Sequence, residues 1–196
     1  EFYNSRSAEE QSFFRQASLL GAVDKNTLSE LFQNDAATSL ITEFGASQFP
    51  LIRRLENDKY ELHSFFKDFL HEKLLAIDGL ETKQRLHALF ADRYEAIGEL
   101  QEAIHHTLQM QNWPKLIRLL TEGSEQLLAQ APLFVKNVLE SLPQEQFLAD
   151  PRLVILRGSA LVQLGDMAGA YRCYREAVAQ KASGALAADA IAGYRR

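Results

Sequence analysis

The stretch from Phe49 to Leu75, FPLIRRLENDKYELHSFFKDFLHEKLL, constrains the fold of this chain more than any other. Its first half holds two extended runs with apolar positions, separated by Glu56-Asn57-Asp58, whose side chains favour a short polar turn. We therefore predict a β-hairpin here. The second half changes period, because its apolar residues recur along one broad helical face: Phe65, Phe66, Phe69, Leu70 and Leu74. This spacing predicts a helix with a phenylalanine core stripe and an N-cap at Ser64, directly after His63.

Short helices are predicted ahead of the hairpin. Ser7 and Glu10 form a capping box, and the helix that they open is expected to end at Gly21. Asp24 or Thr27 caps a second helix, and a third is predicted over residues 35–44. Helices, then a small hairpin, then a helix is the outline of a winged-helix domain, which we assign to residues 1–77.

The remainder of the chain reads as helix. Asp78-Gly79 is a turn signal and marks the predicted boundary between the two parts. We assign residues 78–150 to a helical arm of tetratricopeptide-like (TPR-like) character and residues 151–196 to the start of a TPR repeat array. The predicted fold class is therefore mainly α: a small winged-helix domain with a short β-hairpin, followed by an antiparallel helical region.

The TPR prediction rests on the spacing of small and aromatic residues. In that repeat, a small residue is followed by glycine seven positions later, then by alanine, an aromatic and alanine at intervals of five, four and three. Five residues fit every step, namely Gly158, Gly165, Ala170, Tyr174 and Ala177. The earlier series Tyr94, Gly98, Ala103 and Thr107 fits a degenerate copy. Small residues let paired helices approach closely, so these positions are predicted to pack the repeat.

Several segments together resemble one protein family. Tyr60-x-x-His63-x-Phe65-Phe66-x-Asp68-Phe69-Leu70 resembles the winged-helix segment of large bacterial transcription activators of the maltose-regulon type. The run from Tyr94 to Trp113, and Leu142-Pro143 with Pro151-Arg152-Leu153, are similar to segments that follow it in the same family. The resemblance covers about residues 13–180. It identifies the chain as similar to MalT-like, LuxR-family proteins of the STAND class of signal-transduction NTPases.

The resemblance implies an ATP- or ADP-dependent switch in a longer protein. Such proteins carry a nucleotide-binding domain before the winged helix and a DNA-binding helix-turn-helix at the C-terminus. No G-x-x-x-x-G-K-[ST] motif occurs in this sequence, so we expect no cofactor to be held by these residues alone, with ATP or ADP bound elsewhere in the full-length protein. We therefore expect a regulatory piece of a longer protein, without enzymatic activity or catalytic residues of its own.

His63 is the principal candidate site residue. The resemblance implies that a histidine at this position reaches the β-phosphate of bound ADP and holds the resting state closed. Arg53 and Arg54, just before the turn, are candidates to contact the same nucleotide. The residues alone leave other readings open, since a histidine can also cap a helix or fill the edge of a hairpin, and paired arginines are often solvated.

Other chemistry finds little support. The single cysteine, Cys173, excludes an internal disulfide and a cysteine-rich zinc site. His105 and His106 are adjacent and point about 100° apart on a helix, so no metal site is predicted. The net charge of −5 argues against a general nucleic-acid-binding surface, and the third helix, 35–44, contains no lysine or arginine to meet DNA. We find no signal peptide or membrane span, and expect a cytoplasmic protein.

Two functions follow for testing. The first is the regulatory part of a signal-transduction ATPase that controls transcription, with the winged helix governing nucleotide-dependent closure and the helical repeats sensing an inducer. Its expected partners are the nucleotide-binding domain of the same chain, a small-molecule or protein inducer, and a second copy when activated. DNA would be met only through a separate C-terminal helix-turn-helix. The alternative is a stand-alone TPR-type protein-interaction module.

Overall fold

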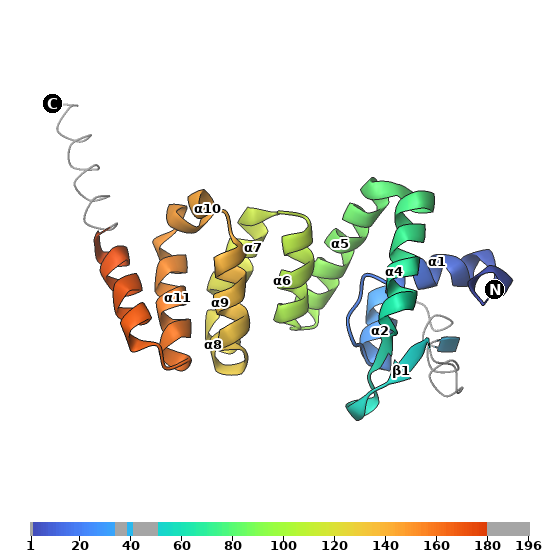
Figure 1. Cartoon of the computed structure of the whole chain (residues 1–196), viewed down its shortest axis with the longest axis horizontal. Helices are drawn as coiled ribbons and strands as arrows, with labels where there is room; N and C mark the ends of the chain where they lie inside the picture. Colours follow the sequence, from blue (N-terminus) through green and yellow to red (C-terminus); the bar gives the residue numbers. More distant parts are fainter. Residues whose placement is uncertain (1, 34–38, 41–50, 180–196) are drawn as a thin grey trace. The chain divides into compact units, whose positions relative to one another are not determined.

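The computed structural model of the chain describes residues 2–33, 39–40 and 51–179. They fall into two units, Glu1–Glu99 and Leu100–Arg196, which are described separately below (Figure 1). Both are mainly helical, and a two-stranded antiparallel sheet lies in the first, so the predicted fold class is confirmed. Of the predicted third helix, only residues 39–40 belong to the described part, and they are helical.

The first unit follows the predicted order of helices, hairpin and helix (Figure 1). Its elements are η1 (Tyr3–Ser5), α1 (Ala8–Ala17), α2 (Lys25–Phe32), β1 (Ile52–Arg54), η2 (Glu56–Asp58), β2 (Tyr60–Leu62), α4 (Ser64–Lys73), the π-helical segment η3 (Leu74–Asp78) and α5 (Gly79–Ala96). The turn predicted at residues 56–58 is the short 3-10 helix η2, which joins the two strands of the wing.

Helix starts in this unit are fixed by local side-chain contacts. The predicted capping box is present: Ser7 accepts a hydrogen bond from the Glu10 backbone N–H, and the Glu10 carboxylate accepts one from the Ser7 N–H. Asp24, rather than Thr27, caps α2 by accepting from the Thr27 N–H. Helix α1 ends earlier than predicted, at Ala17.

The start of α4 lies one residue before the predicted cap. Ser64 is the first helical residue and His63 holds the N-cap position, so the assignment of Ser64 as N-cap was wrong. The reason is that the backbone of His63 makes one hydrogen bond to the wing side and one to the helix. Its N–H donates to the Leu51 carbonyl beside the wing, at 2.8 Å, and its carbonyl accepts the first bond of the helix from the Lys67 N–H, at 2.9 Å.

The wing is tied back to the helices by a short third pairing. Strands β1 and β2 pair antiparallel, with Ile52 opposite Leu62 and Arg53 opposite Glu61. Val23, in the segment between α1 and α2, exchanges two backbone hydrogen bonds with Tyr60, at 2.7 and 2.9 Å. Ile52, Tyr60 and Leu62 are buried, so one face of the hairpin closes the core.

Aromatic rings fill that core. Phe14 of α1 is fully buried and contacts Phe66 of α4 edge-on, with ring centroids 5.9 Å apart. Phe32 of α2 meets Phe90 of α5 in the same manner, at 5.7 Å. The prediction that Phe65 also belongs to the core was wrong, since its side chain is 80% exposed. Consecutive helical residues point about 100° apart, so burying Phe66 turns Phe65 toward solvent.

Helix α5 belongs with the first unit. The predicted boundary between residues 77 and 78 falls at the end of η3, where Gly79 has a φ of +80° and turns the chain. The unit nevertheless continues to Glu99, because α5 packs against α2 through the Phe32–Phe90 contact.

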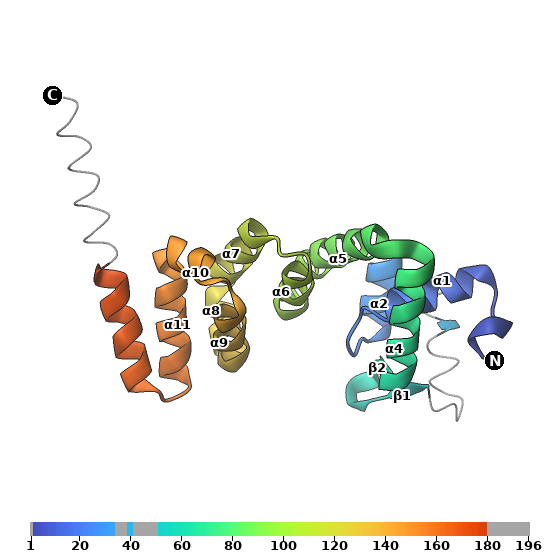
Figure 2. The same cartoon turned by 45° about the horizontal axis from the view of Figure 1, so that its top comes forward.

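The second unit is an array of helices (Figure 2). Its elements are α6 (Leu100–Gln109), α7 (Trp113–Glu122), α8 (Ser124–Gln130), α9 (Pro132–Ser141), α10 (Gln144–Ala149), α11 (Pro151–Gln163) and the helical segment 167–179. Three helices begin with proline in their first turn, where no intrahelical partner for the missing N–H is needed. Helix α11 packs against α7, α8, α9 and α10. Among the described residues, no helix is long and apolar enough to cross a membrane.

The residues of the predicted repeat meet within this unit. A Cβ placed on Gly158 would lie 2.7 Å from the Tyr174 ring, so α11 and segment 167–179 approach as closely as a glycine allows. Gly165 has a φ of +83° and makes the turn between them. Ala170 and Ala177 are buried on the same hairpin.

Candidate functional site

His63 lies where the wing passes into α4. Its backbone is fixed on both sides by the bonds to Leu51 and Lys67 described above. Its side chain makes no capping bond to the helix and stacks on the exposed ring of Phe65, with centroids 5.5 Å apart and planes 26° apart. His63 is half-buried. The two backbone hydrogen bonds and the stacking on Phe65 fix its position.

The candidate arginines lie on the wing beside it. Arg53 and Glu61 are cross-strand neighbours, so their side chains lie on the same face of the wing. Arg53 donates to the Glu61 carboxylate at 2.7 Å; the Arg53 side chain is exposed and that of Glu61 is half-buried. Arg54 pairs with Asp58 across the turn, and this hydrogen bond raises the pKa of the Arg54 guanidinium.

The three predicted residues belong to the wing and to its junction with α4, and their side chains differ in the contacts that they already make. His63 offers an imidazole that can donate a hydrogen bond to a phosphate oxygen. Arg53 and Arg54 are each engaged by a carboxylate, so a phosphate would have to compete with Glu61 or Asp58. The arginines are exposed wing residues paired with carboxylates, and a nucleotide contact by His63 stays a prediction.

A buried ion pair that the sequence analysis missed ties α1 to the end of η3. Arg15 is 7% exposed; its Nε donates to one carboxylate oxygen of Asp78 at 2.5 Å and its Nη2 to the other at 3.2 Å. Its Nη1 donates to the Tyr3 hydroxyl at 2.7 Å. The bond to Asp78 raises the pKa of Arg15 against the opposing effect of burial. The only local signal is a charged residue directly beside buried Phe14.

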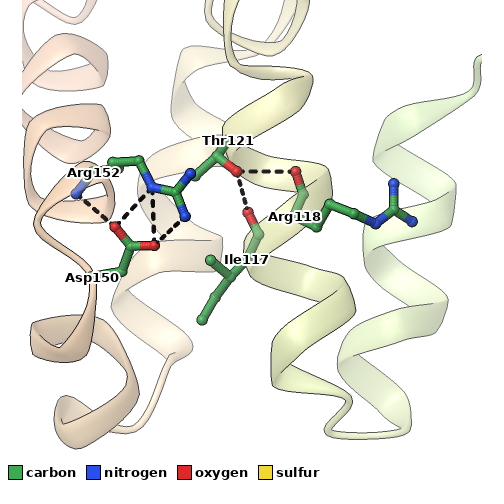
Figure 3. A network of polar contacts seen from close by, with 5 residues as sticks. All are labelled: Ile117, Arg118, Thr121, Asp150 and Arg152. Carbon is green, nitrogen blue, oxygen red and sulfur yellow. Dashed lines mark hydrogen bonds and ion pairs between the residues drawn. The ribbon is translucent and has the colours of Figure 1, made fainter.

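A polar cluster in the second unit fixes the start of α11 (Figure 3). Asp150 accepts from the backbone N–H of Arg152 and from its guanidinium, with distances from 2.6 to 3.1 Å. The guanidinium bond is the main cause of the lowered pKa of Asp150. On α7, the Thr121 hydroxyl is held by the carbonyls of Ile117 and Arg118, so it has no proton left to donate to a ligand.

Histidine and cysteine side chains elsewhere in the chain differ in their burial and in their pKa values. Burial lowers the pKa of the His71 imidazole and raises the pKa of the Cys173 thiol. His105 is exposed and His106 is fully buried, with their rings edge-on. Within the described ranges, no group of three or more histidine, cysteine, aspartate or glutamate side chains is arranged to hold a metal ion.

Comparison with known proteins found a family match for the first part of the chain. Residues 1–81 match the family model of the MalT winged helix domain. The HTH-type transcriptional regulator MalT of Serratia proteamaculans (strain 568) is 26% identical over 153 residues, which are 76% of this chain and 17% of that relative. No solved structure matches the chain. These findings support the resemblance to MalT-like proteins. The LuxR, STAND and TPR assignments stay predictions.

Proposed function

We propose that this chain, which begins with a winged helix domain of the MalT type, is the regulatory middle part of a signal-transduction ATPase that controls transcription. The observation that carries the proposal is His63: it lies within the 81 residues that match the MalT winged helix model, at the junction of wing and helix, with its imidazole free of a capping role. The curated relative is by name a transcriptional regulator.

In this proposal the winged helix controls nucleotide-dependent closure. His63 donates a hydrogen bond to the β-phosphate of ADP that is bound by a nucleotide-binding domain of the same protein. A hydrogen bond to a charged group contributes roughly 1.5–3 kcal/mol. Since it forms only in the closed state, it shifts the balance between closed and open forms roughly ten- to a hundredfold.

The helical unit has the sensing role. It offers open cavities between its helices, which suit an inducer or a protein partner better than the tightly packed winged helix does. DNA contact is assigned to a separate helix-turn-helix, because the wing arginines are already paired with carboxylates. The chain itself is then neither an ATPase nor a DNA-binding domain.

The alternative is a stand-alone protein-interaction module of the TPR type. The close approach of Gly158 to Tyr174 favours it, since such packing is what that repeat requires. The two functions differ in what they demand of His63: an interaction module needs it only for structure, whereas a nucleotide switch needs it for regulation.

His63→Ala tests the proposal in two settings. In the full-length protein we expect higher transcription without inducer and faster release of ADP, because the closed state alone loses a bond. In the 196-residue chain the melting temperature should stay nearly unchanged, because His63 makes no side-chain hydrogen bond to the helix.

The matched control is His105→Ala, which removes another accessible imidazole far along the sequence. It should leave both activity and ADP release unaltered. A destabilised chain together with no rise in inducer-free activity for His63→Ala would overturn the nucleotide-clamp role and favour the interaction module.

A further inference from the structure

One cavity of the second unit carries an unusual set of charges. It has a volume of about 340 Å³ and lies between α9, α10, α11 and segment 167–179. Leu142 and Phe147 supply apolar walls, and three charged side chains line it: Glu140, Arg157 and Glu176. Small-molecule sites in proteins are clefts of about this size, mostly apolar, with a few polar groups that orient the ligand.

Arg157 is held in place by packing and carries little hydrogen bonding. Its guanidinium carbon lies 5.7 Å from the centre of the Phe147 ring, within reach of a cation–π contact. Its nearest carboxylate oxygen, from Glu140, is 3.7 Å away, which is too long for a hydrogen bond. Its Nε is buried and finds no acceptor among the described residues.

Arg152, on the same helix, is an arginine whose guanidinium is paired with a carboxylate and serves for comparison. Its Nε and Nη2 both bond to the Asp150 carboxylate, at distances from 2.6 to 3.1 Å. Arg157 has no such partner, so its planar fork remains available for a carboxylate that arrives with a ligand.

The carboxylates of the cavity are also unequally engaged. Glu140 accepts a hydrogen bond from Lys136 of its own helix at 2.8 Å and is the distant partner of Arg157. Glu176 lines the same cavity from segment 167–179 and forms no ion pair with any described residue. Among the described residues, the cavity thus holds one cation, Arg157, without a carboxylate at hydrogen-bond distance and one anion, Glu176, without a paired cation.

We propose that this cavity binds a free α-amino acid with an apolar side chain. Its carboxylate lies on the Arg157 guanidinium, its ammonium group on Glu176, and its side chain against Phe147 and Leu142. A purely cationic ligand would give Arg157 no counter-ion, and a purely anionic ligand would be repelled by Glu140 and Glu176. The site gives the sensing role proposed above a ligand class, and its regulatory meaning rests on that proposal.

Titration calorimetry on the 196-residue chain tests the chemistry directly. L-leucine and L-phenylalanine are the probes, with L-leucinamide lacking the carboxylate and N-acetyl-L-leucine lacking the ammonium group. We expect saturable binding of at least one amino acid and a loss of about tenfold or more for both derivatives, because each removes one charge-assisted contact.

Two substitutions assign the contacts. Arg157→Met keeps the length of the apolar stem, and Glu176→Gln keeps the shape of the side chain; each should weaken binding of the amino acid about tenfold or more. Arg175→Met is the matched control, since Arg175 lies over Tyr171 outside this cavity and its loss should leave affinity unchanged. Melting curves show that each variant folds, and Glu176→Gln, with an exposed side chain, decides the matter if Arg157→Met does not.

The proposal is overturned if neither amino acid binds, if leucinamide and N-acetyl-leucine bind as well as leucine, or if Glu176→Gln has no effect. None of these measurements involves His63 or transcription. Failure of the amino-acid site and failure of the proposed regulatory function are therefore separate results.

Discussion

Arg15 stabilises the first unit through a partner, Asp78, that lies far from it in the sequence. Its side chain is 9% exposed, and its charge is compensated by Asp78, whose side chain is 25% exposed. Removing one partner from a buried pair leaves an uncompensated charge, which is costlier than losing a pair in solvent.

Asp78→Ala should therefore lower the free energy of unfolding of the first unit by about 3 kcal/mol. The control is Glu61→Ala, which breaks the exposed Arg53–Glu61 pair and should cost less than about 1 kcal/mol. Urea unfolding, followed by circular dichroism, measures both. Equal losses for the two variants would show that Arg15 is not held as the structure indicates.

Asp24 gives the first unit an acid-sensitive contact. Burial alone would raise the pKa of this carboxyl, but hydrogen bonds from the backbone and hydroxyl of Thr27, and a smaller one from the Asn26 N–H, lower it overall. A carboxyl whose pKa is lower in the folded than in the unfolded protein stabilises the fold at neutral pH. That contribution fades as the pH falls below about 4.

Asp24→Ala should cost about 1 kcal/mol at pH 7, because α2 loses its cap, and less near pH 3, because a protonated carboxyl keeps a capping oxygen but loses its charge. Asp24→Asn retains the capping oxygen without its charge, so it should cost less at pH 7 and show no such pH dependence of its own. Thermal melts of both variants and the natural chain at the two pH values provide the test. A constant penalty for Asp24→Ala would exclude ionisation as its source.

At the scale of secondary-structure elements, the hairpin of α11 and segment 167–179 depends on one glycine. Gly158 lies under the Tyr174 ring, whose hydroxyl also lies 3.2 Å from the Ser159 hydroxyl. A methyl group added there would meet three ring atoms at 2.7 to 3.1 Å. Overpacking of this kind typically costs about 1–3 kcal/mol.

Gly158→Ala should destabilise the chain by that amount. In a Tyr174→Ala background the same change should be neutral or stabilising, since alanine is favoured over glycine inside a helix by about 1 kcal/mol. The double-mutant cycle, measured by denaturant unfolding, isolates the contact. If Gly158→Ala costs the same with and without the ring, Tyr174 is not what requires a glycine.

At the scale of the whole molecule, the two compact units meet in sequence at Glu99 and Leu100. Ile97, Gly98 and Glu99 are exposed, and Gly98 turns the chain with a φ of +80°. Residues 75–82, which span the sequence-predicted boundary after residue 77, are helical, and Asp78 is bonded to Arg15.

Limited digestion with a protease of broad specificity should therefore cut first between residues 96 and 100, because exposed turns open more readily than helices with buried bonds. Mass spectrometry of the first two fragments locates the site. Initial cleavage within residues 75–82 would instead support the sequence-based boundary after residue 77. Asp78→Ala should move cleavage toward that segment.

Much of the architecture was contained in short-range sequence patterns. The capping box at Ser7, the cap at Asp24, the hairpin around Glu56–Asp58 and the helix after His63 follow from spacings of a few residues. Such patterns can be read because backbone hydrogen bonding and side-chain periodicity act over one or two turns of chain. The position of His63 at the junction of wing and helix was predictable for this reason.

Only the tertiary structure decided which surfaces meet. The Arg15–Asp78 bond joins residues 63 positions apart, and no local sequence pattern predicts it. Packing on Phe14 chose Phe66 for the core and left Phe65 outside, although both lie on the predicted apolar face. Contact with α2 assigned α5 to the first unit. Arg157 entered a cavity with Glu140 and Glu176 through the packing of separate helices. Distant pairings of this kind depend on how whole elements fill space together, and the local sequence around each residue does not encode that outcome.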